Sequence, residues 1–469
     1  MVVMLCCMAM FAGCIEDGYT TSPSDQPRFS TDTLSLGTVF TEQPTVTSRF
    51  TVHNPHSKQL SISDISLSGN DADAFRINVD GISGERFSDV DIRGKDSIFV
   101  LVEATFPEGS SPLSRFEASV DFTTNGVTNS VVLVAEGQNV VRIYGETLTA
   151  DTEFTTELPY QIFDSLVVAP GATLTLQPGS ELCFHDKASL IVRGRLLSEG
   201  TVEKPVNLRG DRTGNVVGDI SFDIMSRQWT GVFFTSTSQG NVLKHTDVRN
   251  TVQGITVEGD GSGTLSAPQL YMLNSRLHNS GALVLEAYHS AVKAVGCEFA
   301  EGADGLVYLQ GGKALFNHCT FANNYLFAAI SGAALQFAHI YDDEKTGLDD
   351  GSGLPYLEAD ISNSIIYGIG ADVSHGDLTG SEIYLRRCLM RSGGSDDDNF
   401  IECLWESDPL YYTVRNDYLF DYRVKPESPA IGAADEALTL PEARIDAYGF
   451  ERTLPAEVGA YVFTLPEEE

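Results

Sequence analysis

The chain contains few cysteines for its length, and they are scattered. Of 8 cysteines in 469 residues, Cys6 and Cys7 lie in the first apolar stretch. The others are too sparse for the disulfide framework of a small secreted domain. The sequence also has no Cys-x-x-Cys pair, no P-loop and no Gly-x-Gly-x-x-Gly motif after a strand. Zinc and nucleotide chemistry can therefore be set aside.

Basic residues are scarce as well. The sequence has 30 Lys and Arg residues against 65 Asp and Glu residues, which gives a formal net charge of −35. Nucleic acids and anionic membrane surfaces bind to positive patches, so this balance excludes nucleic acid as a partner. The hydrophobic share of 42% and the charged share of 20% are ordinary for a soluble globular protein. The length predicts two to three domains.

The first 14 residues form an apolar run that ends at Cys14. The run is too short to span a bilayer and has the length of the hydrophobic part of a secretory signal. Its ending over residues 11–14, Phe-Ala-Gly-Cys, resembles the bacterial lipobox. The resemblance implies a signal peptide over residues 1–14 and an acylated Cys14 that anchors the protein in a membrane. No Lys or Arg precedes the run, so we expect the natural start to lie upstream of Met1.

A stretch rich in Thr, Ser and Pro follows, and we predict a tether over residues 15–27. Its acidic pair, Glu16 and Asp17, resembles the export signal of Bacteroidetes surface lipoproteins. The resemblance implies a lipid-anchored protein on the outer membrane that faces the cell exterior. An orientation toward the periplasm is the alternative. We expect a monomer that contacts the membrane through its lipid.

Residues 28–138 predict a β-sandwich. Short stretches with alternating apolar and polar residues, such as 48–52 and 116–122, are separated by turn residues, and about six or seven strands fit. No Cys…Trp…Cys spacing of an antibody domain occurs. Several stretches resemble the ASPM/SPD-2/hydin-like immunoglobulin family: residues 36–39, 51–54, 65–69, 73–75 and 135–137. The resemblance implies a spacer or interaction module rather than an enzyme.

Residues 139–432 predict a coil of short strands. The segment 166–179 contains two strands joined by Pro-Gly corners. Farther on, the apolar residues that close Asn-Ser-x-apolar-like units recur at steps of 22, 22, 45 and 24: Leu277, Phe299, Phe321, Ile366 and Met390. We interpret the step of 45 as two turns of the coil, one of which carries the loop 341–353. A period near 22 fits one turn of a parallel β-helix, whose turns stack about 4.8 Å apart.

This coil resembles the pectin-lyase-like superfamily. Residues 229–234, Trp-Thr-Gly-Val-Phe-Phe, match the strand that often opens the regular turns in that family. Residues 428–435 and 459–461 resemble the closing segment of bacterial surface β-helix proteins, so we expect residues 433–469 to cap the open end of the coil. The predicted fold class is all-β, with an immunoglobulin-like sandwich followed by a single-stranded right-handed parallel β-helix.

The catalytic signatures of this superfamily are absent. Neither the basic motifs of pectate lyases nor the Asp-Asp and Gly-His-Gly signatures of polygalacturonases occur, and such hydrolases need paired carboxylates. Basic residues do recur at equivalent positions of the coil: Lys244, His245, Arg249, Arg276, Lys293, Lys313, Arg386 and Arg387. They either line a groove for a negative glycan or balance neighbouring Asp and Glu on outward faces. The candidate catalytic residues are Arg276, His278 and Lys293.

One acidic loop, residues 341–351, has the composition of a Ca²⁺ site. Calcium takes six to eight oxygen ligands, and Asp342, Asp343, Asp349 and Asp350 are the candidate ligands. The spacing of an EF-hand is absent, and a solvated loop is the alternative. No other cofactor is expected.

Two functional hypotheses follow. The leading one is a non-catalytic surface lipoprotein whose β-helix presents a binding face to a glycan or protein partner. The alternative is a divergent polysaccharide lyase or glycoside hydrolase that acts on an acidic polysaccharide. A groove in which Arg, Lys and carboxylates converge favours the enzyme, and flat faces of Thr, Ser and Asn favour binding.

Overall fold

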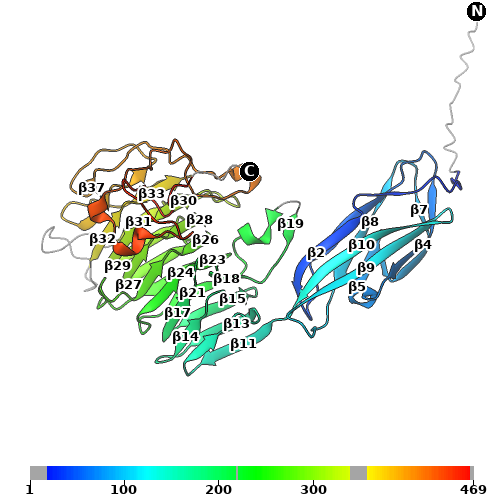
Figure 1. The fold of residues 1–469 in the computed structure, drawn as a ribbon, viewed down its shortest axis with the longest axis horizontal. Helices are drawn as coiled ribbons and strands as arrows, with labels where there is room; N and C mark the ends of the chain where they lie inside the picture. Colours follow the sequence, from blue (N-terminus) through cyan, green and yellow to red (C-terminus); the bar gives the residue numbers. More distant parts are fainter. Residues whose placement is uncertain (1–17, 218–219, 339–355, 465–469) are drawn as a thin grey trace, which may run out of the picture. The chain divides into compact units, whose positions relative to one another are not determined.

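The computed structural model describes residues 18–217, 220–338 and 356–464. These residues divide into two compact units, with the boundary between Asn139 and Val140. The predicted class, a sandwich followed by a right-handed parallel β-helix, is confirmed (Figure 1). Helical structure in the described ranges consists of short 3-10 turns: η1 (Ala72–Ala74), η2 (Phe222–Ile224), η3 (Arg415–Asp417), η4 (Glu436–Leu438) and η5 (Pro441–Arg444). None of these turns has the length or apolar character of a membrane span.

The first unit is a two-sheet sandwich. Alternation buries Phe50, Val52, Val100 and Phe122 between the sheets. One sheet contains β1 (Arg28–Phe29), β3 (Ser48–His53), β8 (Ser97–Ala104), β5 (Phe75–Val79) and β6 (Ile82–Gly84). The other contains β2 (Thr33–Phe40), β10 (Val127–Gln138), β9 (Leu113–Thr124), β4 (Leu60–Ser68) and β7 (Arg86–Ile92). These are more strands than the pattern predicted, because edge strands such as β6 and β7 are mostly exposed and lack a regular apolar alternation.

Residues 18–27 were predicted as part of a tether, but they pack against the sandwich. Tyr19 forms a parallel bridge with Gln59, and the Asn125 side chain donates hydrogen bonds to the backbone carbonyls of Ser22 and Asp25. The segment is fixed because amide groups of the sandwich satisfy its backbone. The predicted signal peptide with Cys14, and the start of the tether, lie outside the described residues.

The second unit is a coil whose strands pair in parallel along three faces (Figure 1). Face A contains β11 (Val141–Leu148), β13 (Tyr160–Val168), β15 (Glu181–Phe184), β18 (Val206–Gly210), β23 (Thr246–Arg249), β26 (Arg276–Ser280), β28 (Glu298–Gly302), β30 (Thr320–Asn323), β33 (Ile365–Gly368) and β36 (Leu389–Met390). Face B contains the ends of β11 and β13, then β16 (Ser189–Val192), β21 (Gly231–Phe234), β24 (Ile255–Glu258), β27 (Leu285–Val295), β29 (Val307–Asn317), β31 (Leu335–Ala338) and β34 (Val373–Ser374). Face C contains β12 (Thr152–Phe154), β14 (Thr173–Leu176), β17 (Arg195–Glu199), β22 (Asn241–Lys244), β25 (Leu270–Leu273), the ends of β27 and β29, β32 (Leu357–Ser362), β35 (Glu382–Arg386) and β37 (Phe400–Ile401).

The predicted register of the coil is confirmed, with one exception. Leu277 pairs with Phe299, and Phe299 pairs with Phe321 on face A. Phe321 then pairs directly with Ile366, so the step of 45 residues is one turn of the coil and not two. The strands of that turn have ordinary lengths, and its extra residues lie between them. Spacing in the sequence cannot separate a long insertion from an additional turn.

A tight corner joins face C to face A. In successive turns a single residue with positive φ makes this corner, as Asn274 (49°), His318 (49°) and Asn363 (49°) do. Asparagine tolerates this conformation better than most residues, which explains the repeated Asn-Ser pattern. The residue after each corner is small and buried, and it is a free cysteine at Cys297 and Cys319.

The strands of the coil end earlier than predicted, and the described part of the segment after them runs back beside the coil. The last strand is β37, and residues 405–464, which we call the strap, extend back along the coil. Asn274 donates to the carbonyl of Ile445, and Asn363 donates to the carbonyl of Asp435. The strap therefore lies beside several turns, because the corner asparagines bind its backbone. The prediction of a coil to residue 432 and a cap over 433–469 was wrong in this respect.

Candidate functional site

The outward side chains of face A form two columns along the coil. Alternation turns Leu208, Val248 and Leu277 into the core, so the residues between them point outward. One column contains Glu181, Asn207, Asp247, Arg276 and Glu298. The other contains Cys183, Arg209, Arg249 and His278. The predicted candidates Arg276 and His278 are thus neighbours on β26, whereas Lys293 lies on face C.

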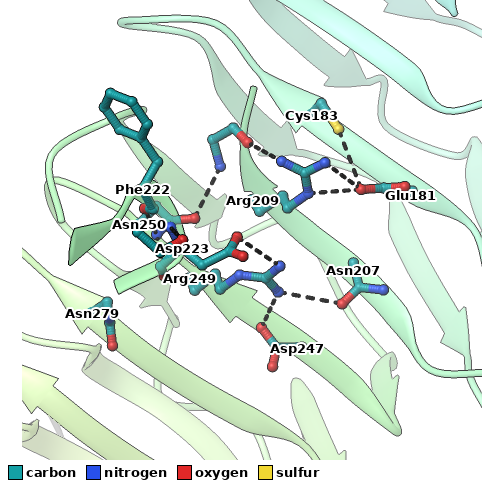
Figure 2. Close-up of polar contacts among 12 residues, drawn as sticks. Glu181, Cys183, Asn207, Arg209, Phe222, Asp223, Asp247, Arg249, Asn250 and Asn279 are labelled. Atoms are coloured by element: carbon teal, nitrogen blue, oxygen red, sulfur yellow. Dashed lines mark hydrogen bonds and ion pairs between the residues drawn. The ribbon is translucent and has the colours of Figure 1, made fainter. Parts of the chain in front are cut away.

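Asp247 is a carboxylate that three basic residues of this face share, and Figure 2 shows its contact with Arg249. Its Oδ1 accepts a 2.8 Å hydrogen bond from Arg249 and lies 3.1 Å from His278 Nε2, and its Oδ2 lies 3.5 Å from Arg276 Nη1. Burial by itself raises the pKa of Asp247, but His278, Arg249 and Arg276 outweigh burial and hold that pKa well below its ordinary value. Asp247 is therefore a carboxylate that keeps its charge at neutral pH.

The neighbouring arginines are paired in the same way (Figure 2). Arg209 Nε donates to Glu181 at 2.7 Å. Arg249 also reaches Asn207 Oδ1 and Asp223 Oδ1, each at 3.3 Å. Asp223 comes from the excursion between β18 and β21, which contains the short strands β19 (Asn215–Val217) and β20 (Ile220–Ser221). Arginine and carboxylate thus alternate across the face.

This arrangement lacks a general acid or base that is ready to transfer a proton. Such a group must change its protonation state near the working pH and reach the substrate. Asp247 stays ionised, and His278 has Nε2 on Asp247 and Nδ1 within 2.9 Å of Asn279 Oδ1. Guanidinium groups keep their protons. Face A is therefore an ion-pair network in the described residues.

Two of the recurring basic residues on face C are also paired with carboxylates. Lys313 Nζ lies 2.7 Å from Glu358 on face C, and Arg386 Nη1 lies 2.9 Å from Asp360. The geometry agrees with the interpretation in which recurring cations balance neighbouring carboxylates.

Two further carboxylates lie under the strap. Glu298 accepts hydrogen bonds from Arg276 and from the Tyr461 hydroxyl, and Glu301 accepts one from the Tyr422 hydroxyl. Burial, opposed by the hydrogen bond from Tyr422 and assisted by the charge of Glu298, raises the pKa of Glu301 to about 8. A carboxyl group that is protonated at neutral pH is a feature of general acids. Glu301 is only 3% exposed, however, and the strap separates it from solvent.

A pocket of about 280 Å³ opens where this network meets the strap, and we call it the face A pocket. Arg276 and Asn207 are on its floor, the turn with Val202 and Pro205 makes one wall, and the strap supplies Tyr448. Asp247 also lines it. The network residues are therefore accessible to a small ligand at one edge.

Lys293 belongs to a second and larger pocket of about 430 Å³, the face C pocket. Val242, Tyr271 and Lys293 come from successive turns of face C, where they pair in register. The Lys293 ammonium lies 5.4 Å from the centre of the Tyr271 ring and 2.7 Å from Glu442 of the strap. Burial, assisted by the charge of Glu442, raises the pKa of Tyr271 to about 12, so the phenol stays neutral. Arg195 and Gln239 are polar residues of the lining.

No metal site is evident in the described part of the chain, which contains no group of three or more His, Cys, Asp or Glu residues that could hold an ion. The candidate calcium ligands Asp342, Asp343, Asp349 and Asp350 lie outside the described residues.

Sequence reasoning missed Asp247, Tyr271 and the strap residues. Asp247 could have been found, because it lies 29 residues before Arg276, a separation that fits one turn of the coil with a short insertion, and the two residues pair in register. Tyr448 and Glu442 carry no such signal. They reach the pockets only because the strap returns along the coil.

Comparisons with known proteins add little to this picture. The sequence matches no protein-family model and no curated protein. Among solved structures, it is similar to the catalytic unit of a family 87 α-1,3-glucanase from Streptomyces thermodiastaticus, at 11% identity over 73% of each chain with a TM-score of 0.17. A PapD-like domain of human CEP192 is 12% identical, covers 30% of this chain and 96% of that chain, and has a TM-score of 0.18. A family 123 glycoside hydrolase from Clostridium perfringens is 10% identical, with 24% of this chain and 26% of that chain covered and a TM-score of 0.18. Likenesses this low carry no argument about function.

Proposed function

We propose that this protein is a non-catalytic glycan-binding lipoprotein of the outer membrane, anchored by an acyl group on Cys14 and exposed at the cell surface. The observation that carries the binding proposal is the face C pocket, a hollow of about 430 Å³ in which the half-buried Tyr271 ring lies among both polar and apolar residues. Ligand pockets of proteins have volumes of about 300–1,000 Å³.

The chemistry of the face C pocket suits a sugar ring. An aromatic face offers apolar contact to the C–H side of a pyranose, and the polar groups around it can bind the hydroxyls. Tyr271 offers such a face, while Arg195, Gln239 and Lys293 line the same pocket. Because Lys293 forms an ion pair with Glu442, the floor of the pocket is preorganised for a ligand.

The proposal that the protein is not a catalyst is supported by the open part of face A, where Asp247 is held by Arg249, Arg276 and His278 and keeps its charge. Membrane attachment is supported by the lipobox-like ending at Cys14, and surface exposure by the acidic pair behind it. The strongly acidic composition also suits a protein that has to stay soluble outside the cell.

The test uses the full chain with Cys14→Ser, which cannot be acylated, on a glycan array with titration calorimetry of the sugars found. We expect saturable binding that Tyr271→Ala weakens about tenfold or more. Tyr144→Ala is the matched control, because Tyr144 is 65% exposed on β11, several turns away. Equal binding by both variants would contradict the assignment to face C.

A parallel assay decides between binding and catalysis. The same chain is incubated with acidic and neutral polysaccharides, with and without Ca²⁺, and unsaturated products and new reducing ends are measured. We expect no product. Product formation that Arg276→Ala abolishes would make the protein an enzyme and overturn the proposal.

A further inference from the structure

The face A pocket is a second cavity of the coil, distinct from the face C pocket in its residues. Its lining combines the floor residues Asn207 and Arg276, the turn residues Val202 and Pro205, and Tyr448 of the strap. Its volume of about 280 Å³ lies just below the usual range of ligand pockets, which suits a single ring rather than a chain.

The floor of the face A pocket offers hydrogen-bond donors. Arg276 uses Nε for Glu298 and has an ion-pair contact to Asp247 through Nη1, while its side chain is 35% exposed. A guanidinium has five N–H donors, so donors are left for a ligand. Asn207 accepts from Arg249 through Oδ1, which leaves the amide Nδ2 as its donating side. A ligand with several acceptor oxygens fits this floor.

The electrostatics of the floor disfavour an anionic ligand. Asp247 lines the pocket, and Glu298 lies 3.1 Å behind Arg276. Both nearby arginines are already paired with carboxylates: Arg276 with Asp247 and Glu298, and Arg249 with Asp247 and Asp223. His245 also lines the pocket, but burial and the charge of Lys244 lower its pKa, so it carries no charge at neutral pH. A carboxylate that enters would therefore meet two negative charges without a spare positive one. The ligand that fits is uncharged.

The walls of the face A pocket include apolar surface from two segments, the turn with Val202 and Pro205 and the strap with Tyr448. Tyr448 is 46% exposed, with the Tyr461 ring centre at 5.3 Å and the Arg423 guanidinium at 5.5 Å from its own ring. Gly449 lies against Val202, so the strap and the opposite wall meet at one edge. A ring with one apolar side can pack against Tyr448 while its oxygens reach the floor.

We propose that the face A pocket is a second sugar site that takes one neutral pyranose unit and discriminates against uronic acids. This inference deepens the proposed glycan-binding function but is carried by different residues. Because Tyr448 comes from the strap, the site exists only when the strap is docked on the coil.

The experiment compares the full Cys14→Ser chain with three variants: Tyr271→Ala, which disables the face C pocket, Tyr448→Ala, and the double variant. The probes are the methyl glycosides of glucose, galactose, mannose and N-acetylglucosamine, each at millimolar concentration, together with the methyl glycosides of glucuronic and galacturonic acid. Binding is measured by saturation-transfer NMR. Tyr418→Ala is the matched control, because Tyr418 is also a partly exposed tyrosine of the strap but does not line the pocket.

We expect the Tyr271→Ala variant to bind at least one neutral glycoside and to bind the uronides about tenfold more weakly or not at all. Addition of Tyr448→Ala should remove that residual binding, while Tyr418→Ala should not. Two results would overturn the inference and leave the glycan-binding function standing: loss of all binding with Tyr271→Ala alone, or uronides that bind this variant as well as neutral sugars do. Absence of binding by the unmutated pockets would reject the glycan-binding function and this site together.

Discussion

The two halves of face A have the same backbone arrangement but carry different outward side chains. From β15 to β26 the outward columns carry arginines and carboxylates that are partly open to solvent, as Arg209, Arg249 and Arg276 show. From β28 to β36, Glu298 is the last charged member of its column and is followed there by Thr320, Ile365 and Leu389, while the other column carries Ala300 and Ala322. The strap covers this second half and forms a small core on it with Tyr411, Tyr422, Val424, Ala430, Val458 and Ala460.

The difference between the charged half and the apolar half of face A explains the position of the face A pocket. An outward column of apolar residues requires a cover, because exposed apolar area costs free energy, whereas a column of paired charges does not. The apolar part of the strap packs on face A as far as Glu298, the residue at which the column becomes charged. There the Tyr461 hydroxyl donates a hydrogen bond to Glu298. The pocket is therefore a consequence of the boundary between a covered half and an open half.

The largest effect is expected from a charge in the covered half. Ile365→Asp places a carboxylate at a position that is 1% exposed beneath the strap, without a cation to pair it. We expect a loss of about 4 kcal/mol or more in the free energy of unfolding, or release of the strap. Thermal unfolding and limited proteolysis measure the two outcomes. Ile445→Asp, at a strap position that is 52% exposed, is the control and should cost less than about 0.5 kcal/mol.

The next largest effect is expected from Asp247 in the open half. Asp247→Asn removes the carboxylate that Arg249, Arg276 and His278 share. We expect the free energy of unfolding, measured with a denaturant, to fall by about 3 kcal/mol. Asp223→Asn is the matched change on the same face, because Arg249 is its one ion-pair partner among the described residues and its side chain is 61% exposed, so the loss in the free energy of unfolding should stay below about 1 kcal/mol. Equal losses would contradict the central role of Asp247.

The pH dependence of stability distinguishes the two halves. Glu301 in the covered half has its pKa raised from 4.5 to about 8, so the folded protein keeps a proton that the unfolded chain loses above pH 4.5. The contribution of Glu301 to the free energy of unfolding is complete below pH 4.5. As the pH rises from 4.5 toward 8, the free energy of unfolding falls by up to about 1.4 kcal/mol per pH unit. Glu301→Gln should remove this slope in unfolding experiments between pH 5 and 8. A slope that persists in this variant would assign the proton to another group.

The smallest effect is expected from an isolated pair on face C. Lys313 and Glu358 pair at 2.7 Å but are both substantially exposed, and no second carboxylate has a described contact with Lys313. Lys313→Met should change the free energy of unfolding by less than about 1 kcal/mol, measured as for Asp247→Asn. A loss as large as that of Asp247→Asn would mean that pairing alone, and not the shared network, stabilises the charged half.

Much of the fold could be predicted, because its signals are local. Alternation within strands and a period near 22 residues identified the coil, and the pairing of Leu277, Phe299 and Phe321 follows from that period. The site was predicted in part, since Arg276 and His278 do share β26. Their pairing with Asp247 depends on which turns are neighbours, and insertions obscure that order in the sequence.

The sequence by itself determined the sandwich, the coil and the outward position of the basic residues, because alternation and short-range repeats decide these features. Only the tertiary structure decided that the strap returns along face A, that a step of 45 residues is a single turn, and that Tyr448 and Glu442 complete two pockets. The physical reason is the range of the interactions. Asn274 and Ile445 meet across 171 positions of the chain, and no local pattern encodes a contact between a corner amide and a distant carbonyl.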